Sequence, residues 1–445
     1  MTGFLGQLAQ VGGVAAAAWI AGWFASRAGF PPDREFRIER IGWSWALGAG
    51  IVASMVPIAF LARVRPSWPV FLVLAAASAA GAWILRVRSA AWGRPSAGLV
   101  VSRASAYGAE RPLTAVLGGL VLLGVVLYLL RTLTEPMWSN DYVAIWGLKG
   151  KTIHASEGIP SRLFGDPSLG FSHPEYPLGL PFLYSGVSFL TGRFDDHAMA
   201  LLFPLFQVAT LVTLFGWLRR HGATRLVAGI ATAILACFEP LYSAFTTGLA
   251  EVPLSLGLLL FGTALADALE GDPGALRRAA LGSTLIAATK NEGLFFAAAG
   301  CAIALLFGGE RRFKAAAAAL PTALLVYGLH VILRGRLPLR DFDFGSASAA
   351  RVAEALGAAV RLPGVIVWMQ LALLAVLIVL GRRAPEGSWL LVLCGAGLAA
   401  YILLPAFAVR GPEWLVATSL PRTAAGLAPL AAAAVAIRWR RVIAA

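Results

Sequence analysis

The sequence contains little charge. Only 13% of its 445 residues are Asp, Glu, Lys or Arg, whereas a soluble domain carries about 25%. Hydrophobic residues make up 58% of the chain, and its mean hydropathy is +0.75. A bilayer-spanning helix needs roughly 20 mostly apolar residues, and such runs recur from near the N-terminus to Ile437. We therefore predict an all-α polytopic membrane protein.

Cysteine is also scarce. The chain has three cysteines, each inside an apolar run and without CxxC spacing: Cys237, Cys301 and Cys394. This pattern excludes a disulfide framework and a cysteine metal site, and it is typical of small core residues. The N-terminus lacks the basic region of a secretory signal, since the first arginine is Arg27, so we expect the first span to be retained.

Lysine is the rarest basic residue, because the 37 basic residues include only four lysines. The formal net charge of +14 comes mostly from arginines in short connectors between apolar runs. That distribution indicates membrane topology, with the basic connectors inside, and argues against a nucleic-acid partner. Lys149, Lys151 and Lys290 fall on the predicted outer side instead. Such cations are candidates for binding phosphate, and ordinary lipid-headgroup contact is the alternative.

The apolar runs divide the chain into three parts. Residues 1–130 form N-terminal helices, residues 131–196 form a large extracytoplasmic loop, and residues 197–445 form a C-terminal bundle with outer loops at 334–362 and 410–422. The N-terminus is expected outside and the C-terminus inside. Thirteen spans are predicted, near residues 6–25, 43–62, 68–85, 112–130, 197–217, 224–243, 252–268, 274–289, 293–308, 315–333, 363–380, 389–409 and 423–437.

The large loop is the longest polar interruption of the sequence and contains two candidate motifs. Asp141, in a segment that can form a helix along the membrane surface, suits a general base acting on a hydroxyl, although capping of that helix is an alternative. His173, Glu175 and Tyr176 belong to H-P-E-Y-P, whose prolines stiffen the turn for substrate positioning or for structure alone. The apolar segment 178–191 is too short to span and predicts an interfacial helix.

Later spans add charges at their ends. Glu251 begins a span with a proline in its first turn, so the helix dipole explains its position as well as a functional role does. Lys290 and Glu292 interrupt the apolar run 274–308, and charges in such a place normally line a protein cavity. Arg422 enters the last span, from which it could reach a phosphate.

Three histidines, His154, His173 and His197, are expected on the outer side with carboxylates nearby. A divalent metal is therefore conceivable, but the spacing of these residues is not diagnostic of any ligand set. We predict no metal and no cofactor.

The order of these motifs resembles that of the GT-C superfamily of polyprenyl-phosphate-dependent glycosyltransferases, which includes aminoarabinose transferases and protein O-mannosyltransferases. The stretches that carry the resemblance are Asp141 in the first outer loop, H-P-E-Y-P, A-E-V-P (250–253), T-K-N-E-G (289–293) and, more loosely, S-L-P-R (419–422). The chain departs from the family in having Asn140 before Asp141 where an Asp-Glu pair is frequent, and Glu251 where Asp is common. Its spans before residue 110 have no clear counterpart.

The resemblance implies a GT-C-like bundle in a bacterial inner membrane, with the active site facing the periplasm or the cell exterior. Asp141 would act as general base in an inverting transfer from a polyprenyl-phosphate sugar donor to a glycan, lipid or protein acceptor. The implied substrate-binding residues are Lys149, Lys151, His173, Glu175, Tyr176, Glu251, Lys290, Glu292 and Arg422. The competing interpretations are a multi-pass transporter or flippase and a non-catalytic envelope scaffold.

Overall fold

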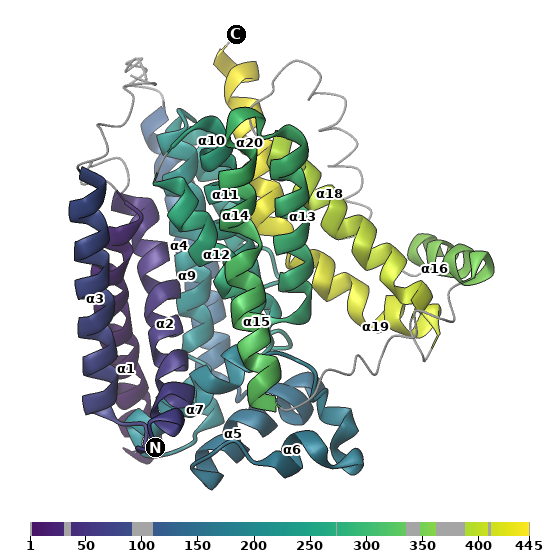
Figure 1. Cartoon of the computed structure of the whole chain (residues 1–445). Helices are drawn as coiled ribbons and strands as arrows, with labels where there is room; N and C mark the ends of the chain where they lie inside the picture. The colour runs from purple at the N-terminus through teal and green to yellow at the C-terminus, as the bar shows by residue number, and fades with distance from the viewer. Residues whose placement is uncertain are drawn as a thin grey trace.

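A computed structural model describes residues 2–30, 37–90, 110–272, 274–334, 348–361, 388–407 and 411–444. These residues form helices and connecting loops, with no strand among them, which confirms the all-α prediction. Eight of the described helices are long and apolar enough to cross a membrane, or up to nine if one bent pair counts as a single span. The protein is thus a polytopic helical bundle (Figure 1).

The helices follow one another along the chain, and most of them run along the long axis of the bundle (Figure 1). Their bounds are α1 (Thr2–Ala25), α2 (Arg37–Leu61), α3 (Trp68–Ala90), α4 (Glu110–Thr134), α5 (Gly147–Ser156), α6 (Ser161–Gly165), α7 (Gly179–Thr191), α8 (Asp196–Met199), α9 (Leu202–Arg220), α10 (Arg225–Ala236), α11 (Glu251–Glu270), α12 (Ala275–Thr289), α13 (Asn291–Phe307), α14 (Arg312–Ala319), α15 (Pro321–Arg334), α16 (Ala349–Arg361), α18 (Ser388–Leu403), α19 (Pro412–Ala425) and α20 (Ala428–Ala444).

The outer surface of the bundle is apolar. Only 11% of the apolar stretch of α3 and 11% of that of α4 are buried by protein. Large apolar side chains such as Leu72, Val73 and Leu122 are exposed there. An exposed apolar surface of this extent is suited to lipid, because a soluble monomer rarely shows one.

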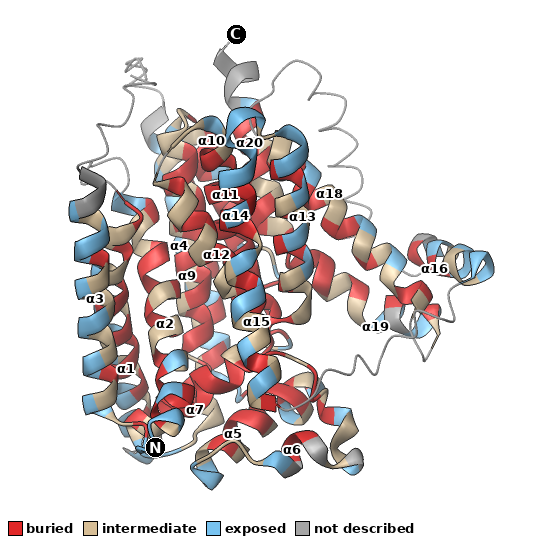
Figure 2. Ribbon diagram, viewed as in Figure 1, coloured by how far each residue is buried: buried red, intermediate tan, exposed pale blue. Residues whose placement is uncertain are grey.

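Helix α11 is the centre of the bundle. Of its apolar stretch, 94% is buried, compared with 72% for the stretch that contains α9. Figure 2 shows α11 as an almost continuous buried helix, with α3 largely exposed at the edge. Burial on all sides explains why its sequence is apolar around the whole circumference. The two ends of α11 are consequently where polar groups can enter the core.

Helices α1 and α2 cross at two glycines. A Cβ atom on Gly22 would lie 1.8 Å from the carbonyl oxygen of Ser44, and one on Gly48 would lie 2.0 Å from that of Ala18. Small residues let helix backbones approach in this way, and the gain is close van der Waals packing in a lipid environment. The N-terminal helices are thereby packed onto the bundle.

The described helices do not reproduce thirteen full spans. Helices α10, α12 and α13 have 12, 15 and 17 residues, fewer than the roughly 20 that a straight crossing needs. The span predicted at 363–380 lies outside the described residues. The break predicted in 274–308 is confirmed, since α12 ends at Thr289 and α13 begins at Asn291.

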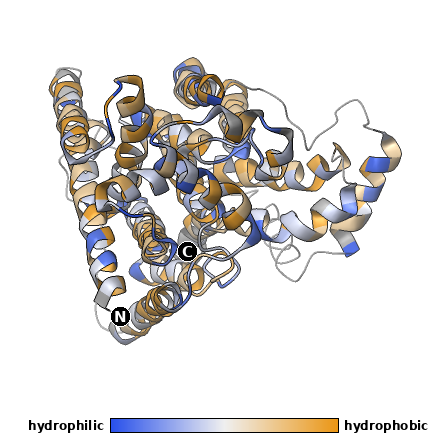
Figure 3. Ribbon diagram, turned by 90° about the horizontal axis from the view of Figure 1, so that it is seen from below, coloured by the Kyte–Doolittle hydropathy of each residue, from blue (hydrophilic) through white to orange (hydrophobic). Residues whose placement is uncertain are grey.

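The short helix predicted at 178–191 is present as α7. Its 13 residues are mostly buried, because α7 packs against α2 and α5. Protein therefore covers this helix on both sides, and it does not lie bare at the surface of the membrane. Together α5, α6 and α7 occupy the end of the bundle away from the C-terminus (Figure 1). Seen from that end, hydrophilic stretches of the chain lie in front of helices that are more hydrophobic (Figure 3).

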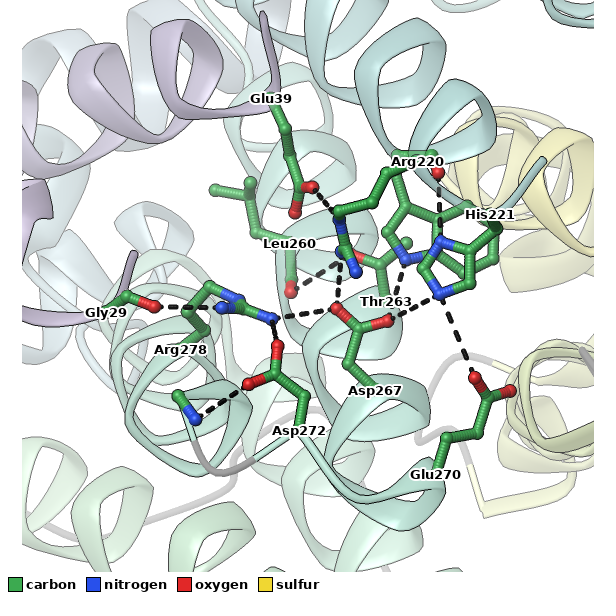
Figure 4. A network of polar contacts seen from close by, with 12 residues as sticks. Gly29, Glu39, Arg220, His221, Leu260, Thr263, Asp267, Glu270, Asp272 and Arg278 are labelled. Carbon is green, nitrogen blue, oxygen red and sulfur yellow. Dashed lines mark hydrogen bonds and ion pairs between the residues drawn. The ribbon is translucent and has the colours of Figure 1, made fainter. Parts of the chain in front are cut away.

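A buried ionic network closes the opposite end of α11 (Figure 4). The Oδ2 atom of Asp267 lies 2.5 Å from Arg220 Nη2 and 2.9 Å from Arg278 Nη2, and its Oδ1 lies 3.0 Å from His221 Nε2. Glu39 Oε2 contacts Arg220 Nε at 2.9 Å. Arg220 and Arg278 belong to the basic residues between apolar runs, yet both side chains are largely buried, because Asp267 and Glu39 neutralise them. The network connects α2, α9, α11 and α12.

Candidate functional site

The helix that begins at Asn140 contains a π-helical stretch, η3 (Tyr142–Trp146), before it continues as α5. Two glycines make room for the Tyr142 ring, since a Cβ on Gly147 would lie 2.6 Å from it and one on Gly248 would lie 2.8 Å from it. Asp141 precedes this stretch with helical backbone angles and makes no capping hydrogen bond. The alternative that Asp141 caps the helix is therefore wrong. Single π-helical turns are frequent at functional sites.

Asp141 instead belongs to a cluster of five charged residues, which we call the outer charge cluster after the side of the membrane that the sequence predicts for it. Arg422 Nη1 lies 2.6 Å from Asp141 Oδ2, and its Nε lies 3.4 Å from Glu251 Oε1. Lys290 Nζ lies 3.3 Å from the same Glu251 oxygen and 2.8 Å from Glu292 Oε1. The start of the loop helix, the start of α11, the α12–α13 break and the end of α19 therefore meet at one point.

Burial differs among the carboxylates of the outer charge cluster. The Glu251 side chain is 3% exposed, whereas that of Asp141 is 31% exposed. Glu251 and Glu292 each occupy the first turn of a helix, where the partial positive charge of the helix end favours an anion. Three carboxylates face only two cations, Lys290 and Arg422. Asp141 is therefore the carboxylate of the cluster best placed to meet a molecule from outside.

The H-P-E-Y-P turn lies beside this cluster. His173 Nδ1 contacts Glu175 Oε1 at 3.0 Å. The ring of Tyr176 stacks on that of Trp146 with centroids 5.4 Å apart and on that of His173 at 4.8 Å. Tyr176 also interacts electrostatically with Arg422. The structure thus brings the three residues of this motif together, and through Tyr176 it links them to Arg422, the partner of Asp141. That the turn faces a substrate stays a prediction.

The four cations proposed for phosphate binding separate into three groups. Lys290 and Arg422 belong to the outer charge cluster. Lys149 is fully buried, and its Nζ donates a hydrogen bond to the carbonyl oxygen of His173 at 2.5 Å. Lys151 is exposed, and no contact joins it to the cluster among the described residues. The geometry thus favours Lys290 and Arg422 as phosphate ligands over the two lysines of α5.

Burial lowers the pKa of Lys149 from 10.5 to about 7, although Glu175 opposes the shift and Arg334 adds to it. We expect one lysine side chain to titrate near pH 7, because the buried ammonium ion has lost its hydration. Lysine labelled with 13C and 15N would show this by NMR, since the chain contains only four lysines and Lys149→Met removes one resonance.

The lowered pKa of Lys149 also makes the stability of the folded protein depend on pH. Its pKa in the folded protein is below the value of about 10.4 for an exposed lysine. Burial of Lys149 therefore costs most stability below about pH 7, and the cost declines as the pH rises toward 10. Wild-type protein should gain stability relative to Lys149→Met over that interval. Four lysine resonances that all titrate near pH 10 would contradict this environment.

Some polar residues of the site were missed by the sequence analysis. Tyr401 on α18 interacts electrostatically with Glu292 and Glu251. Arg334, at the end of α15, donates to the carbonyl oxygens of Pro174 and Glu175. Tyr401 gave no signal because it lies inside a long apolar run, and Arg334 could have been found only as a basic residue at the border of a predicted outer loop.

The three outer histidines have separate surroundings. His154 packs on Phe189 with ring centroids 4.8 Å apart, and His197 stacks on Phe4 at 4.3 Å. His173 pairs with Glu175, as described above. Among the residues that the structure describes, no group of three or more His, Cys, Asp or Glu side chains is arranged to hold a metal ion.

A small apolar groove with a cavity volume of about 70 Å³ lies between α2, α7, α9, α11 and α12, next to the outer charge cluster. Thr289 is its polar lining residue, and Pro253 lines it two residues after Glu251. Its other lining residues are apolar, and many of them are small: Ala46, Ala49, Gly50, Ala53, Gly179, Leu180, Leu183, Phe206, Leu256, Gly257, Leu285 and Ala288. The groove thus has an almost entirely apolar lining and ends one residue before Lys290.

Comparisons with known proteins identify no relative of this chain. No family model, curated protein or solved structure matches this chain.

Proposed function

We propose that this protein is an inverting membrane glycosyltransferase that uses a polyprenyl-phosphate sugar donor. The observation that carries the proposal is the direct pairing of Asp141 with Arg422, in a cluster with Glu251, Lys290 and Glu292. These residues come from the separate motifs that resemble the GT-C superfamily. Their meeting at one point supports a GT-C-like bundle of about thirteen transmembrane helices, placed in a bacterial inner membrane with this end outward.

In this reaction Asp141 acts as general base. It accepts the proton of the acceptor hydroxyl or amine while that oxygen or nitrogen attacks the anomeric carbon. The bond between the anomeric carbon and the phosphate oxygen breaks, and its electron pair leaves with the phosphate. Attack opposite to the leaving group inverts the anomeric configuration. The ion pair with Arg422 orients the carboxylate for this step.

The departing phosphate gains negative charge and needs cations close by. Arg422 and Lys290 are the candidates, and both are held by carboxylates before reaction. Once Asp141 takes up the proton, its attraction for Arg422 falls, so the guanidinium charge becomes available to the phosphate. Proton transfer and leaving-group stabilisation would be coupled through the 2.6 Å contact of this pair.

The apolar groove supports a lipid-linked donor. A polyprenyl chain is a hydrocarbon, and moving it from the bilayer into a groove between helices costs little because both surroundings are apolar. Thr289 at the polar end of the groove directly precedes Lys290. A donor bound in this way would place its phosphate beside the outer charge cluster.

A transporter or flippase is the competing function, because charged clusters lie at both ends of α11. Such a function needs a polar path between those ends. The polar residues Ser255 and Thr263, which lie between Glu251 and Asp267, donate to carbonyl oxygens of α11 itself at 2.7 and 2.6 Å. The remaining residues of that stretch are apolar, so α11 offers no such path.

Reconstituted protein tests the proposal. Proteoliposomes supplied with polyprenyl-phosphate-linked radiolabelled sugars and an extract of envelope acceptors should release polyprenyl phosphate and form a product of inverted anomeric configuration. Accumulation of labelled lipid in the opposite leaflet without cleavage of the sugar–phosphate bond would contradict it and favour a flippase. Mass spectrometry of envelope glycans from cells with and without the protein would identify the sugar.

A further inference from the structure

The turn 173–178 is held by groups from two distant helices. From α5, Lys149 Nζ donates to the carbonyl oxygen of His173 at 2.5 Å. The amide of Tyr176 donates to that same oxygen at 3.0 Å. The carbonyl oxygen of His173 therefore joins the buried Lys149 to Tyr176, which interacts electrostatically with Arg422.

The second helix is α15. Its Arg334 donates to the carbonyl oxygens of Pro174 and Glu175, and His330 Nδ1 accepts from the amide of Leu178 at 3.2 Å. These contacts satisfy backbone groups that the two prolines of the turn leave without helical partners. The α15 contacts hold the middle and the end of the turn, whereas Lys149 holds its beginning.

The ammonium group of Lys149 also faces two aromatic rings, that of Tyr176 in the turn and that of Trp146 in η3. Its Nζ lies 5.9 Å from the ring centroid of Trp146 and 5.8 Å from that of Tyr176. A cation at this distance from an aromatic face is attracted to it, more strongly when water is excluded. Trp146 and Tyr176 stack on one another, so Lys149 interacts with both rings of this stack.

We propose that Lys149 is a positioning residue, which fastens the turn 173–178 and so holds Tyr176 where its hydroxyl interacts electrostatically with Arg422, the partner of Asp141. The structural part of this inference stands by itself, and only its effect on sugar transfer rests on the proposed function. Lys149 touches neither Asp141 nor Glu251 in any described contact, and it acts on them through Tyr176 and Arg422.

The cost of burying Lys149 supports a role of this kind. An apolar residue in its place would avoid the desolvation of an ammonium ion. The charged groups that face Lys149 are Glu175 from the turn, which favours its charged form, and Arg334 from α15, which opposes it. His173 contributes its carbonyl oxygen from the turn. A charged Lys149 makes a stronger hydrogen bond to that carbonyl than a neutral amine does.

Hydrogen–deuterium exchange of the wild-type protein in nanodiscs tests the structural part. After correction for intrinsic exchange rates, peptides covering 173–178 should lose protection by about tenfold between pH 6 and pH 8.5, the effect of weakening one charge-assisted hydrogen bond. Lys149→Met should show the lower protection at both pH values, and Lys314→Met, which replaces an exposed lysine on α14, should behave as wild type. Equal protection of the turn in all three proteins would overturn the inference.

Sugar transfer in proteoliposomes tests the second part. Lys149→Met should retain donor binding and lose at least tenfold in kcat. Its kcat should not change between pH 6 and pH 8.5. The kcat of Lys314→Met should follow the wild-type pH profile. If the hydrogen exchange of the turn changes and kcat does not, the structural part of the inference stands. Only the effect of Lys149 on Arg422 and sugar transfer would then be refuted. Absence of transfer in the wild type would refute the proposed function and leave the exchange result standing.

Discussion

Replacing Asp141 by Asn is expected to abolish sugar transfer and leave the fold intact. Asparagine keeps the size of the side chain and can still accept a hydrogen bond from Arg422, but it cannot take up the acceptor proton. Loss of a general base costs about 10² to 10⁴ in rate. Arg422 keeps Glu251 as a second partner at 3.4 Å, so no buried charge is left unpaired and thermal stability should change little.

The measurement is the rate of transfer in proteoliposomes under saturating donor and acceptor, with thermal unfolding measured on the same preparations. Glu413→Gln is a matched control, since Glu413 is an exposed acid on α19 that pairs with Arg361 at 2.9 Å and should leave the rate unchanged. Near-normal transfer by Asp141→Asn would exclude this residue as the base. A variant that is inactive because it fails to fold would be recognised by its unfolding curve.

Replacing Asp267 by Asn should strongly destabilise the protein, although Asp267 lies at the opposite end from the proposed reaction. Its carboxylate is 1% exposed and lies within 3.0 Å of charged or polar atoms of Arg220, Arg278 and His221. Asparagine would leave two buried guanidinium groups with less compensating charge. Removing one partner of a buried ion pair typically costs about 3–5 kcal/mol.

Unfolding in mixed micelles with increasing denaturing detergent would measure this loss. Glu270→Gln is the control, because Glu270 is 36% exposed and its contact with His221 spans 3.8 Å; its effect should stay below about 1 kcal/mol. Asp272 Oδ2 also lies 2.6 Å from Arg278 Nη2. Equal midpoints for Asp267→Asn and wild type would show that Glu39 and Asp272 suffice to neutralise the two arginines. Transfer per folded molecule should be normal in both variants.

The two ends of α11 differ in the role that we propose for their carboxylates. At one end a partly exposed carboxylate meets an arginine whose pairing can change during a reaction. At the other end a fully enclosed carboxylate holds four helix ends together, and every change there removes a compensating charge. The same residue types therefore form the site for which we propose a reaction and a structural one, and solvent access differs between them.

The sequence by itself determined the class of fold. Long apolar runs can satisfy their backbone hydrogen bonds in lipid only as helices, so composition and run length sufficed to predict a helical membrane protein. The sequence also predicted the helix break at Lys290, because a charge that interrupts an apolar run normally lines a protein cavity. Glu251 at a helix start followed from Pro253 beside it.

Tertiary structure alone decided which charges meet. Asp141 and Arg422 lie far apart in the sequence and pair only because α19 ends beside both the start of the loop helix and the first turn of α11. Lys149 has the same local pattern as an exposed lysine, yet the turn 173–178 covers it. Arg278 looked like a connector residue, but Asp267 draws it into the core. Local patterns record which residues are polar, whereas the partner of each charge depends on helix packing between distant segments, which no local pattern contains.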